Sequence, residues 1–216
     1  GMRIILMLCS IFTLFSCAGY RFQEKENPFA QYGVKSITIP MFYNKSNLSN
    51  ISAPMTKEMY HMLSTFSGLH IKSGNDDADA VLIGIVDAPS QAKESREATN
   101  LRSAKNAAEE ALGENREDFY IPSTTNVRAS LRLILLKNPS EKEIELLKSS
   151  LGKFAVGPKI IVNETIALSG SFTREIYSDE AIDVIDTQNR SALRSTVDDM
   201  AKNAAQNFKD MILYAF

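Results

Sequence analysis

Apolar residues recur with the period of a β-strand in several stretches of this chain. Polar and apolar positions alternate over residues 34–42 and 127–136, which predicts a strand in each stretch. The run AVLIGIVD at residues 80–87 is apolar at consecutive positions, so it predicts a strand covered on both faces in the middle of a sheet. The remaining predicted strands are a short one over residues 69–72 and a long one over residues 159–177, with a kink at Gly170.

A period of three to four residues predicts two amphipathic helices. The first begins near Ser52 and ends at Gly68, and methionines supply most of its apolar stripe. Such a stripe is typical of a helix face packed on a sheet, while the alternative is an adaptable binding surface. The second helix covers residues 191–216 and has the most sustained helical pattern in the chain. The stripe of the first helix consists of Met55, Met59, Met62, Leu63 and Phe66.

Two further helices are predicted between strands. Residues 91–112 are highly charged and rich in alanine, which indicates a polar helix within an insertion that runs to Asp118. Ser140 and Glu143 have the spacing of a capping box, so a short helix is expected there before Gly152.

These elements predict one α+β domain over residues 34–216. Its expected architecture is a two-layer sandwich, in which two amphipathic helices pack on one face of a four- to five-stranded mixed sheet, with an inserted polar helix near residues 91–118.

The N-terminus has a pattern of its own. Residues 4–15 are a nearly unbroken apolar run behind the single positive charge of Arg3. The run is shorter than the roughly 20 apolar residues of a membrane-spanning helix and matches the apolar region of a secretory signal. Residues 1–16 are therefore predicted to be a signal peptide that is removed, with Gly1 left over from expression.

Leu14, Ser16 and Cys17 resemble the lipobox of bacterial lipoproteins, in which the cysteine becomes the acylated N-terminus, although Phe15 stands where a small or β-branched residue is usual. Residues 17–33 are then a lipidated N-terminus and polar tether, and Ala18 resembles the pattern of outer-membrane sorting. The alternatives are a soluble secreted protein and a buried apolar helix.

Charge and composition narrow the range of functions. The net charge is −2, and it becomes −3 when Arg3 leaves with the signal, so no global field attracts nucleic acid. Cys9 leaves with the signal and Cys17 is acylated, which leaves no thiol for a disulfide. His61 and His70 stand without cysteine neighbours, so no metal site is expected. The sequence has no nucleophile elbow or phosphate loop, so neither catalysis nor a cofactor is expected.

The order of motifs resembles the lipopolysaccharide-assembly lipoprotein family LptE. The resemblance covers most of the mature chain, while the insertion near residues 91–118 departs from the compact plan of the family. The matching stretches are the lipobox, GYRF at 19–22, ITIPMFYN at 37–44, MTKEMY at 55–60, ADAVLIG at 78–84, SGSFTR at 169–174 and DMA at 199–201.

The resemblance implies a function, a partner and a place in the cell. Members of the family are two-helix, four-stranded sandwiches seated as a plug inside the outer-membrane β-barrel LptD, where they help deliver lipopolysaccharide to the outer leaflet. An LptD-like barrel and lipopolysaccharide are therefore the expected partners, and the periplasmic side of the outer membrane is the expected location.

Lipopolysaccharide carries phosphates and acyl chains, so its binding needs cations beside apolar surface. Arg128 and Arg132 lie four residues apart on one face of a predicted strand, with Lys137 just beyond them. Ile134 and Leu136 are expected on the same side. These three cations are the candidate lipopolysaccharide contact, and a solvated outer face or structural ion pairs are the simpler alternatives.

Two other classes of function stay open at the level of sequence. One is a periplasm-facing regulatory or chaperone lipoprotein that acts on a peptidoglycan synthase or a secretion channel. The other is a hydrolytic lipoprotein.

Overall fold

The computed structural model describes residues 25–74, 77–88, 124–149, 157–174 and 182–215. The predicted signal peptide, Cys17 and the helix predicted at 91–112 lie outside these ranges. The described elements are β1 (Lys25–Glu26), η2 (Ala30–Tyr32), β2 (Ser36–Ile39), β3 (Tyr43–Asn44), α2 (Ser52–Leu63), β4 (Phe66–Ser67), β5 (His70–Ser73), β6 (Ala80–Asp87), β7 (Thr124–Lys137), α4 (Glu141–Lys148), η3 (Gly157–Lys159), β8 (Ile160–Thr173) and α5 (Ile182–Ala215).

The main sheet is mixed and has six strands in the described part of the chain. Its order is β5-β2-β6-β7-β8, and β3 pairs with β6 farther along that strand. The neighbours β5, β2, β3 and β6 pair in parallel, whereas β6, β7 and β8 pair antiparallel. The central position predicted for residues 80–87 is confirmed, because β6 has a strand on each side and seven of its eight residues are buried.

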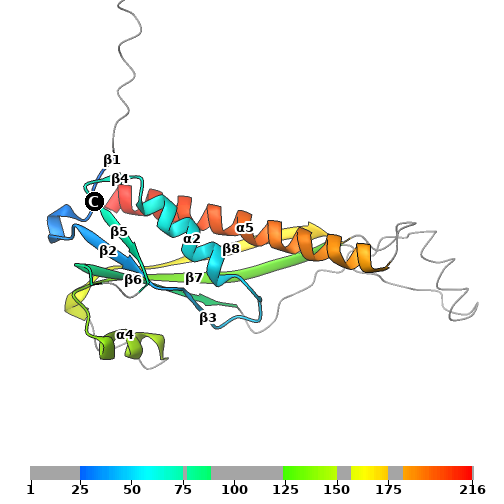
Figure 1. Ribbon diagram of the computed structural model, residues 1–216, viewed down its shortest axis with the longest axis horizontal. Coiled ribbons are helices and arrows are strands. Elements are labelled where there is room, and N and C mark those ends of the chain that lie inside the picture. The colour runs from blue at the N-terminus through cyan, green and yellow to red at the C-terminus, as the bar shows by residue number, and fades with distance from the viewer. Residues whose placement is uncertain (1–24, 75–76, 89–123, 150–156, 175–181, 216) are drawn as a thin grey trace, which may run out of the picture.

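Helices α2 and α5 cover one face of this sheet, as the sequence predicts (Figure 1). The methionines Met55 and Met59 are fully buried between α2 and the sheet, so the stripe is a core face and not a binding surface. The residues that α5 contributes to the core lie between its middle and its C-terminal end: Val197, Met200, Ala201, Ala204, Ala205, Phe208 and Ile212.

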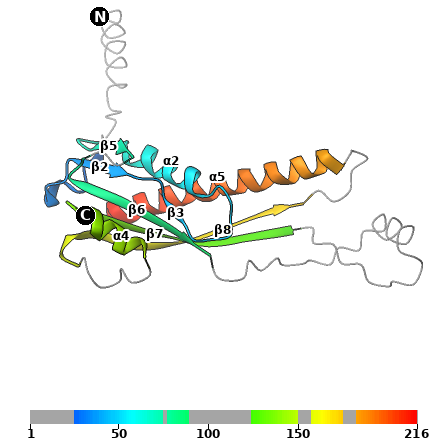
Figure 2. The ribbon, with the colours of Figure 1, turned by 60° about the horizontal axis from the view of Figure 1, so that its bottom comes forward.

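The other face of the sheet carries a helix as well. There, α4 lies beside β6 and β7 (Figure 2). Its Leu147 and Ile144 pack over the outward side chains of these two strands. The predicted capping box is confirmed: Ser140 Oγ accepts from the Glu143 N–H at 3.3 Å, and Glu143 Oε2 accepts from the Ser140 N–H at 2.7 Å. The second buried cluster consists of Val81, Ile83, Ile85, Ile134, Leu136 and Leu147.

Two predicted boundaries are wrong because neighbouring elements intervene. The stretch 34–42 is not one strand: β2 ends at Ile39, and β3 begins at Tyr43 to pair with a different part of β6. The first helix ends at Leu63 and not at Gly68. Residues 66–67 instead form β4, which pairs with β1 at the N-terminal end of the described chain.

The predicted kink at Gly170 is also wrong. The irregularity of β8 lies at its other end, where Leu135 pairs with Val162 and Leu136 with Ile160. At this point β8 has one more residue than the paired part of β7, as in a β-bulge. Gly170 pairs in regular register with Val127, and a Cβ there would lie 2.5 Å from Thr196 Cγ2 of α5. The glycine lets α5 approach the strand closely.

A carboxylate joins the starts of β2 and β6. Asp79 Oδ2 accepts from the N–H groups of Lys35 and Ser36, each at 2.9 Å, and from Ser36 Oγ at 3.0 Å. The backbone hydrogen bond from Lys35 and the hydroxyl of Ser36 lower the pKa of Asp79 below its ordinary value. Asp79 therefore stabilises the parallel pairing of the two strands in its ionised form.

We expect Asp79→Asn to destabilise the protein by about 1 kcal/mol at neutral pH, a value discounted for solvent screening. A carboxylate with a lowered pKa in the folded state stabilises above its unfolded pKa and loses this contribution as the pH falls through the folded value. The difference in the free energy of unfolding between wild type and variant, measured in urea, should therefore become smaller below about pH 4. Asp198→Asn, on the exposed side of α5, is the control. A difference in the free energy of unfolding that does not change with pH would contradict the role assigned to the negative charge of Asp79.

Candidate functional site

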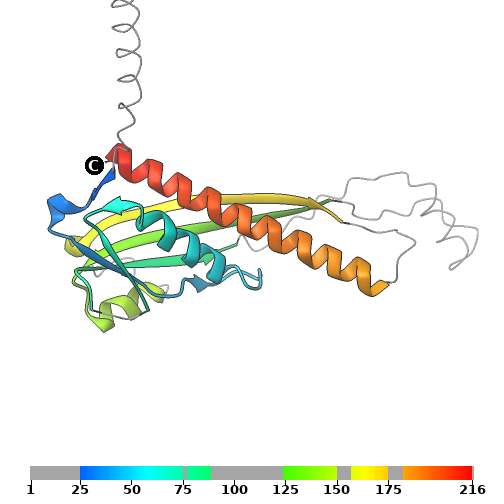
Figure 3. The same ribbon diagram turned by 45° about the horizontal axis from the view of Figure 1, so that its top comes forward.

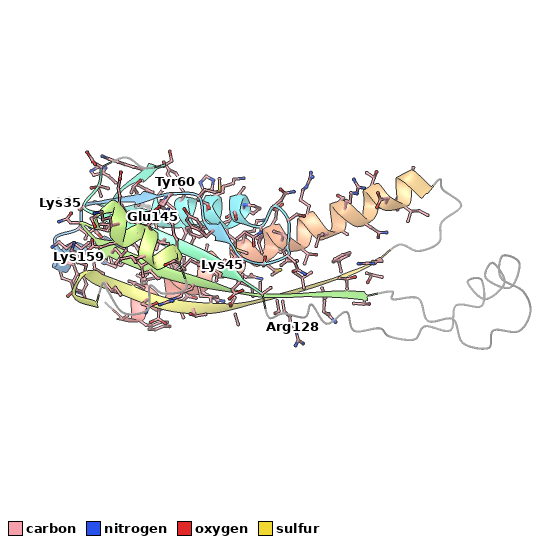
Figure 4. The ribbon with its side chains drawn as sticks, turned by 90° about the horizontal axis from the view of Figure 1, so that it is seen from below. Lys35, Lys45, Tyr60, Arg128, Glu145 and Lys159 are labelled. Carbon is pink, nitrogen blue, oxygen red and sulfur yellow. The ribbon has the colours of Figure 1, made fainter. Side chains whose placement is uncertain are left out.

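Arg128 and Arg132 lie on the face of β7 that points away from α2 and α5. The odd-numbered residues of β7 from Thr125 to Leu135 are buried on the side of these helices, so the alternate positions face outward. Figure 4 shows the Arg128 side chain projecting from β7 on the side away from α5. Four residues of strand separate the two arginines by about 13 Å. The face predicted for them from the sequence agrees with the structure.

The two arginines differ in their surroundings. Arg132 lies between Ile85 of β6 and Thr165 of β8, and its Nε donates to Asn163 Oδ1 at 3.0 Å. Arg128 is exposed and stands opposite Ser169, beyond the last residue of β6. The guanidinium of Arg132 is thus oriented by the neighbouring strand, while that of Arg128 extends into solvent.

Small polar side chains surround the arginines. Residues directly opposite in an antiparallel pair share a face, so the register places alternate residues of β8 beside Arg128 and Arg132. All of these β8 residues are exposed, and most carry a hydroxyl or an amide. They are Asn163, Thr165, Ala167, Ser169, Ser171 and Thr173, and together with Arg128, Ser130 and Arg132 they form what we call the outer polar face.

Lys137 does not join this face. It is five positions from Arg132, so the alternation of the strand turns it to the opposite side. Its Nζ donates to the carbonyl oxygen of Tyr32, the last residue of η2. The structure therefore brings together two of the three predicted cations, and Lys137 links the end of β7 to the N-terminal segment.

The apolar neighbours expected for the arginines are present but covered. Ile134 and Leu136 lie on the same side of β7 as Arg132, as predicted, and both are fully buried beneath α4. The open part of the outer polar face consequently offers hydrogen-bonding groups and positive charge, and its one exposed aliphatic side chain is the methyl group of Ala167. Its chemistry suits phosphate and sugar hydroxyls better than acyl chains.

No carboxylate neutralises the arginines within the described ranges, where neither Arg128 nor Arg132 forms an ion pair. The nearest acid by register is Asp87, which stands opposite Ser130 at the end of β6. The alternative of structural ion pairs is thus not supported for these side chains.

A second concave region lies beside α4. It has a volume of about 390 Å³ and mixes carboxylates, one lysine and apolar side chains. Among the described residues no group of three or more histidine, cysteine or acidic side chains could hold a metal ion. The lining residues are Thr38, Pro40, Asp77, Ala78, Val81, Asn138, Pro139, Glu141, Ile144, Glu145 and Lys148.

Known proteins resemble this chain only distantly. No family model matches the sequence, and no curated protein matches it. The structurally similar proteins include bacterial lipoproteins. The uncharacterized lipoprotein B of Nitrosomonas europaea is 13% identical with a TM-score of 0.40, and the match covers 88% of this chain and 85% of that one. Rare lipoprotein B of Shewanella oneidensis is 10% identical with a TM-score of 0.35, covering 82% and 92%.

A minor lipoprotein of Acinetobacter baumannii is also similar, at 10% identity and a TM-score of 0.36, with 82% of this chain and 94% of that one covered. Scores of this size do not establish a shared fold, so the functional argument rests on the residues of this chain. Among its described helices, none combines the length and the hydropathy needed to cross a membrane.

Sequence reasoning found the arginines but missed the polar residues of β8. Their signal was present in the printed sequence, since every second residue from Asn163 to Thr173 is small or polar. Linking them to Arg128 and Arg132 required the register of β7 and β8, which alternation alone does not specify.

Proposed function

We propose that this protein is a lipid-anchored lipoprotein of the bacterial outer membrane, facing the periplasm, that assists lipopolysaccharide transport as the partner of an LptD-like β-barrel. It acts by binding and not by catalysis. The lipobox-like sequence before Cys17 and the order of motifs along the chain support the anchor and the family resemblance. The outer polar face is the observation that carries the binding role.

The outer polar face would contact the phosphorylated sugar part of lipopolysaccharide. A guanidinium can donate two parallel hydrogen bonds to one phosphate, and Asn163 holds Arg132 ready for such a contact. The hydroxyl and amide groups of β8 can exchange hydrogen bonds with sugar hydroxyls. Because α4 covers Ile134 and Leu136, the acyl chains would bind elsewhere, in the barrel or in the membrane.

The test is the double variant Arg128→Glu/Arg132→Glu. Charge reversal should weaken binding to immobilised lipopolysaccharide at least about tenfold, or roughly 1.4 kcal/mol, and should abolish most of its salt dependence. Affinity capture from membranes would show in parallel whether a barrel protein is bound.

The matched control reverses Arg190 and Arg194, two exposed arginines of α5. Equal loss of binding in both double variants would mean that overall charge, and not the outer polar face, is responsible. Unchanged binding in Arg128→Glu/Arg132→Glu would remove the face from the proposal.

A further inference from the structure

The end of the molecule where the described chain begins brings β1 and the last turns of α5 together (Figures 1 and 3). Lys25 opens β1, and Lys209 belongs to α5. Burial and the nearby charge of Lys25 lower the pKa of Lys209, and Asp210 acts in the opposite direction. Because β1 lies beside the end of α5, these two ammonium groups lie at the same end of the molecule, where their like charges repel.

Among the described residues, no carboxylate neutralises Lys25 or Lys209 by direct contact. Neither Lys25 nor Lys209 forms an ion pair within the part of the chain that the structure describes. The neighbouring Asp210 accepts a hydrogen bond from Gln206 Nε2 at 2.8 Å, and Glu26 is exposed. An external anion placed between the two lysines would relieve the repulsion.

Exposed apolar groups lie next to these cations on α5. Leu213 is 40% exposed, four residues after Lys209 and therefore on the same side of the helix. Tyr214 follows and is 93% exposed. A tyrosine ring with its polar hydroxyl is suited to the boundary between lipid and water. We call Lys25, Lys209, Leu213 and Tyr214 the basal surface.

The position of the proposed anchor keeps the basal surface within reach of the membrane. Cys17 precedes Lys25 by eight residues, which can span at most about 29 Å. A lysine adjacent to an anionic leaflet gains roughly 1 kcal/mol, so the two lysines would add a second contact with the membrane to that of the acylated cysteine.

We propose that the basal surface binds the anionic phospholipid headgroups of the bilayer that holds the acylated Cys17. Phosphates would lie between Lys25 and Lys209, with Leu213 and Tyr214 at the lipid–water boundary. The inference rests on the lipid attachment in the proposed function but not on lipopolysaccharide binding. Its consequence is orientation, because a second contact fixes which end of the sandwich faces the membrane.

The test compares the full chain bound to vesicles of phosphatidylcholine alone with its binding to vesicles that also contain phosphatidylglycerol. An apolar anchor contributes equally to binding of both vesicle types. The ratio of the two partition coefficients therefore measures the contribution of the basal surface. Lys25→Gln/Lys209→Gln should lower this ratio by roughly 10- to 30-fold at low salt. Lys25→Arg/Lys209→Arg should keep it, and Tyr214→Ser should weaken binding to both vesicle types.

Lys45→Gln/Lys57→Gln is the matched control, because it removes two exposed lysines outside the basal surface. The proposal is overturned if the ratio is unchanged in Lys25→Gln/Lys209→Gln, or if the control lowers it equally. Acylation is read separately by mass spectrometry and lipopolysaccharide binding by the arginine variants. Failure of the proposed function and failure of the basal surface therefore give different results.

Discussion

Replacing Cys17 with alanine is expected to move the protein from the membrane pellet to the soluble periplasmic fraction. Each buried methylene contributes about 0.8 kcal/mol, so the several acyl chains expected on this cysteine supply far more binding free energy than any surface contact. The two lysines of the basal surface together contribute about 2 kcal/mol, which is too little to hold the protein in a washed membrane. Fractionation followed by immunoblotting measures the distribution.

Cys9→Ala is the matched control for this experiment. Cys9 lies within the predicted signal peptide, so its replacement should leave the mature protein acylated and membrane-bound. Mass spectrometry of wild type should show acyl groups on an N-terminal Cys17. A Cys17→Ala variant that is cleaved and still pellets with membranes would show that another part of the protein provides the anchor.

Gly84→Ala is expected to destabilise the fold by about 2–3 kcal/mol. Gly84 lies in the central strand β6, and a Cβ there would stand 2.4 Å from two ring atoms of Phe42. The ring is only 3% exposed, so it cannot turn into solvent to make room. Overpacking of this kind costs typically 1–3 kcal/mol, and in a domain of this size the melting temperature should fall by roughly 4–12 °C.

A double-mutant cycle separates this contact from a general effect of the glycine. Phe42→Leu removes part of the ring volume, so it should cost less in the Gly84→Ala background than in wild type. Gly157→Ala is the control, because nothing lies within 4 Å of a Cβ at that position. Additive losses at residues 84 and 42 would contradict the steric explanation.

The features predictable from the sequence are those that depend on local pattern. The apolar run of residues 80–87 makes a strand buried on both faces, and its predicted bounds agree with the structure. The capping box at Ser140 forms within four residues, so distant parts of the chain hardly affect it. The methionine stripe of α2 follows from the helical period alone.

The candidate site was only half predictable. Strand alternation is enough to put Arg128 and Arg132 on one face, and the same rule would have put Lys137 on the other. Only its closeness in sequence associates Lys137 with the arginines. Whether the arginines stand beside polar or apolar surface depends on α4 and β8, which reach them only through the fold.

The sequence by itself thus determined the α+β class, the central strand and the two core-facing helices, because each follows from periodicity. It also predicts lipid attachment at Cys17 from a short motif. Only the tertiary structure decided the contacts between distant segments. It placed α4 over Ile134 and Leu136, set the hydroxyl groups of β8 beside the arginines, and brought the end of α5 beside β1. Such contacts depend on register and on packing between faces, which residues far apart in the chain fix together.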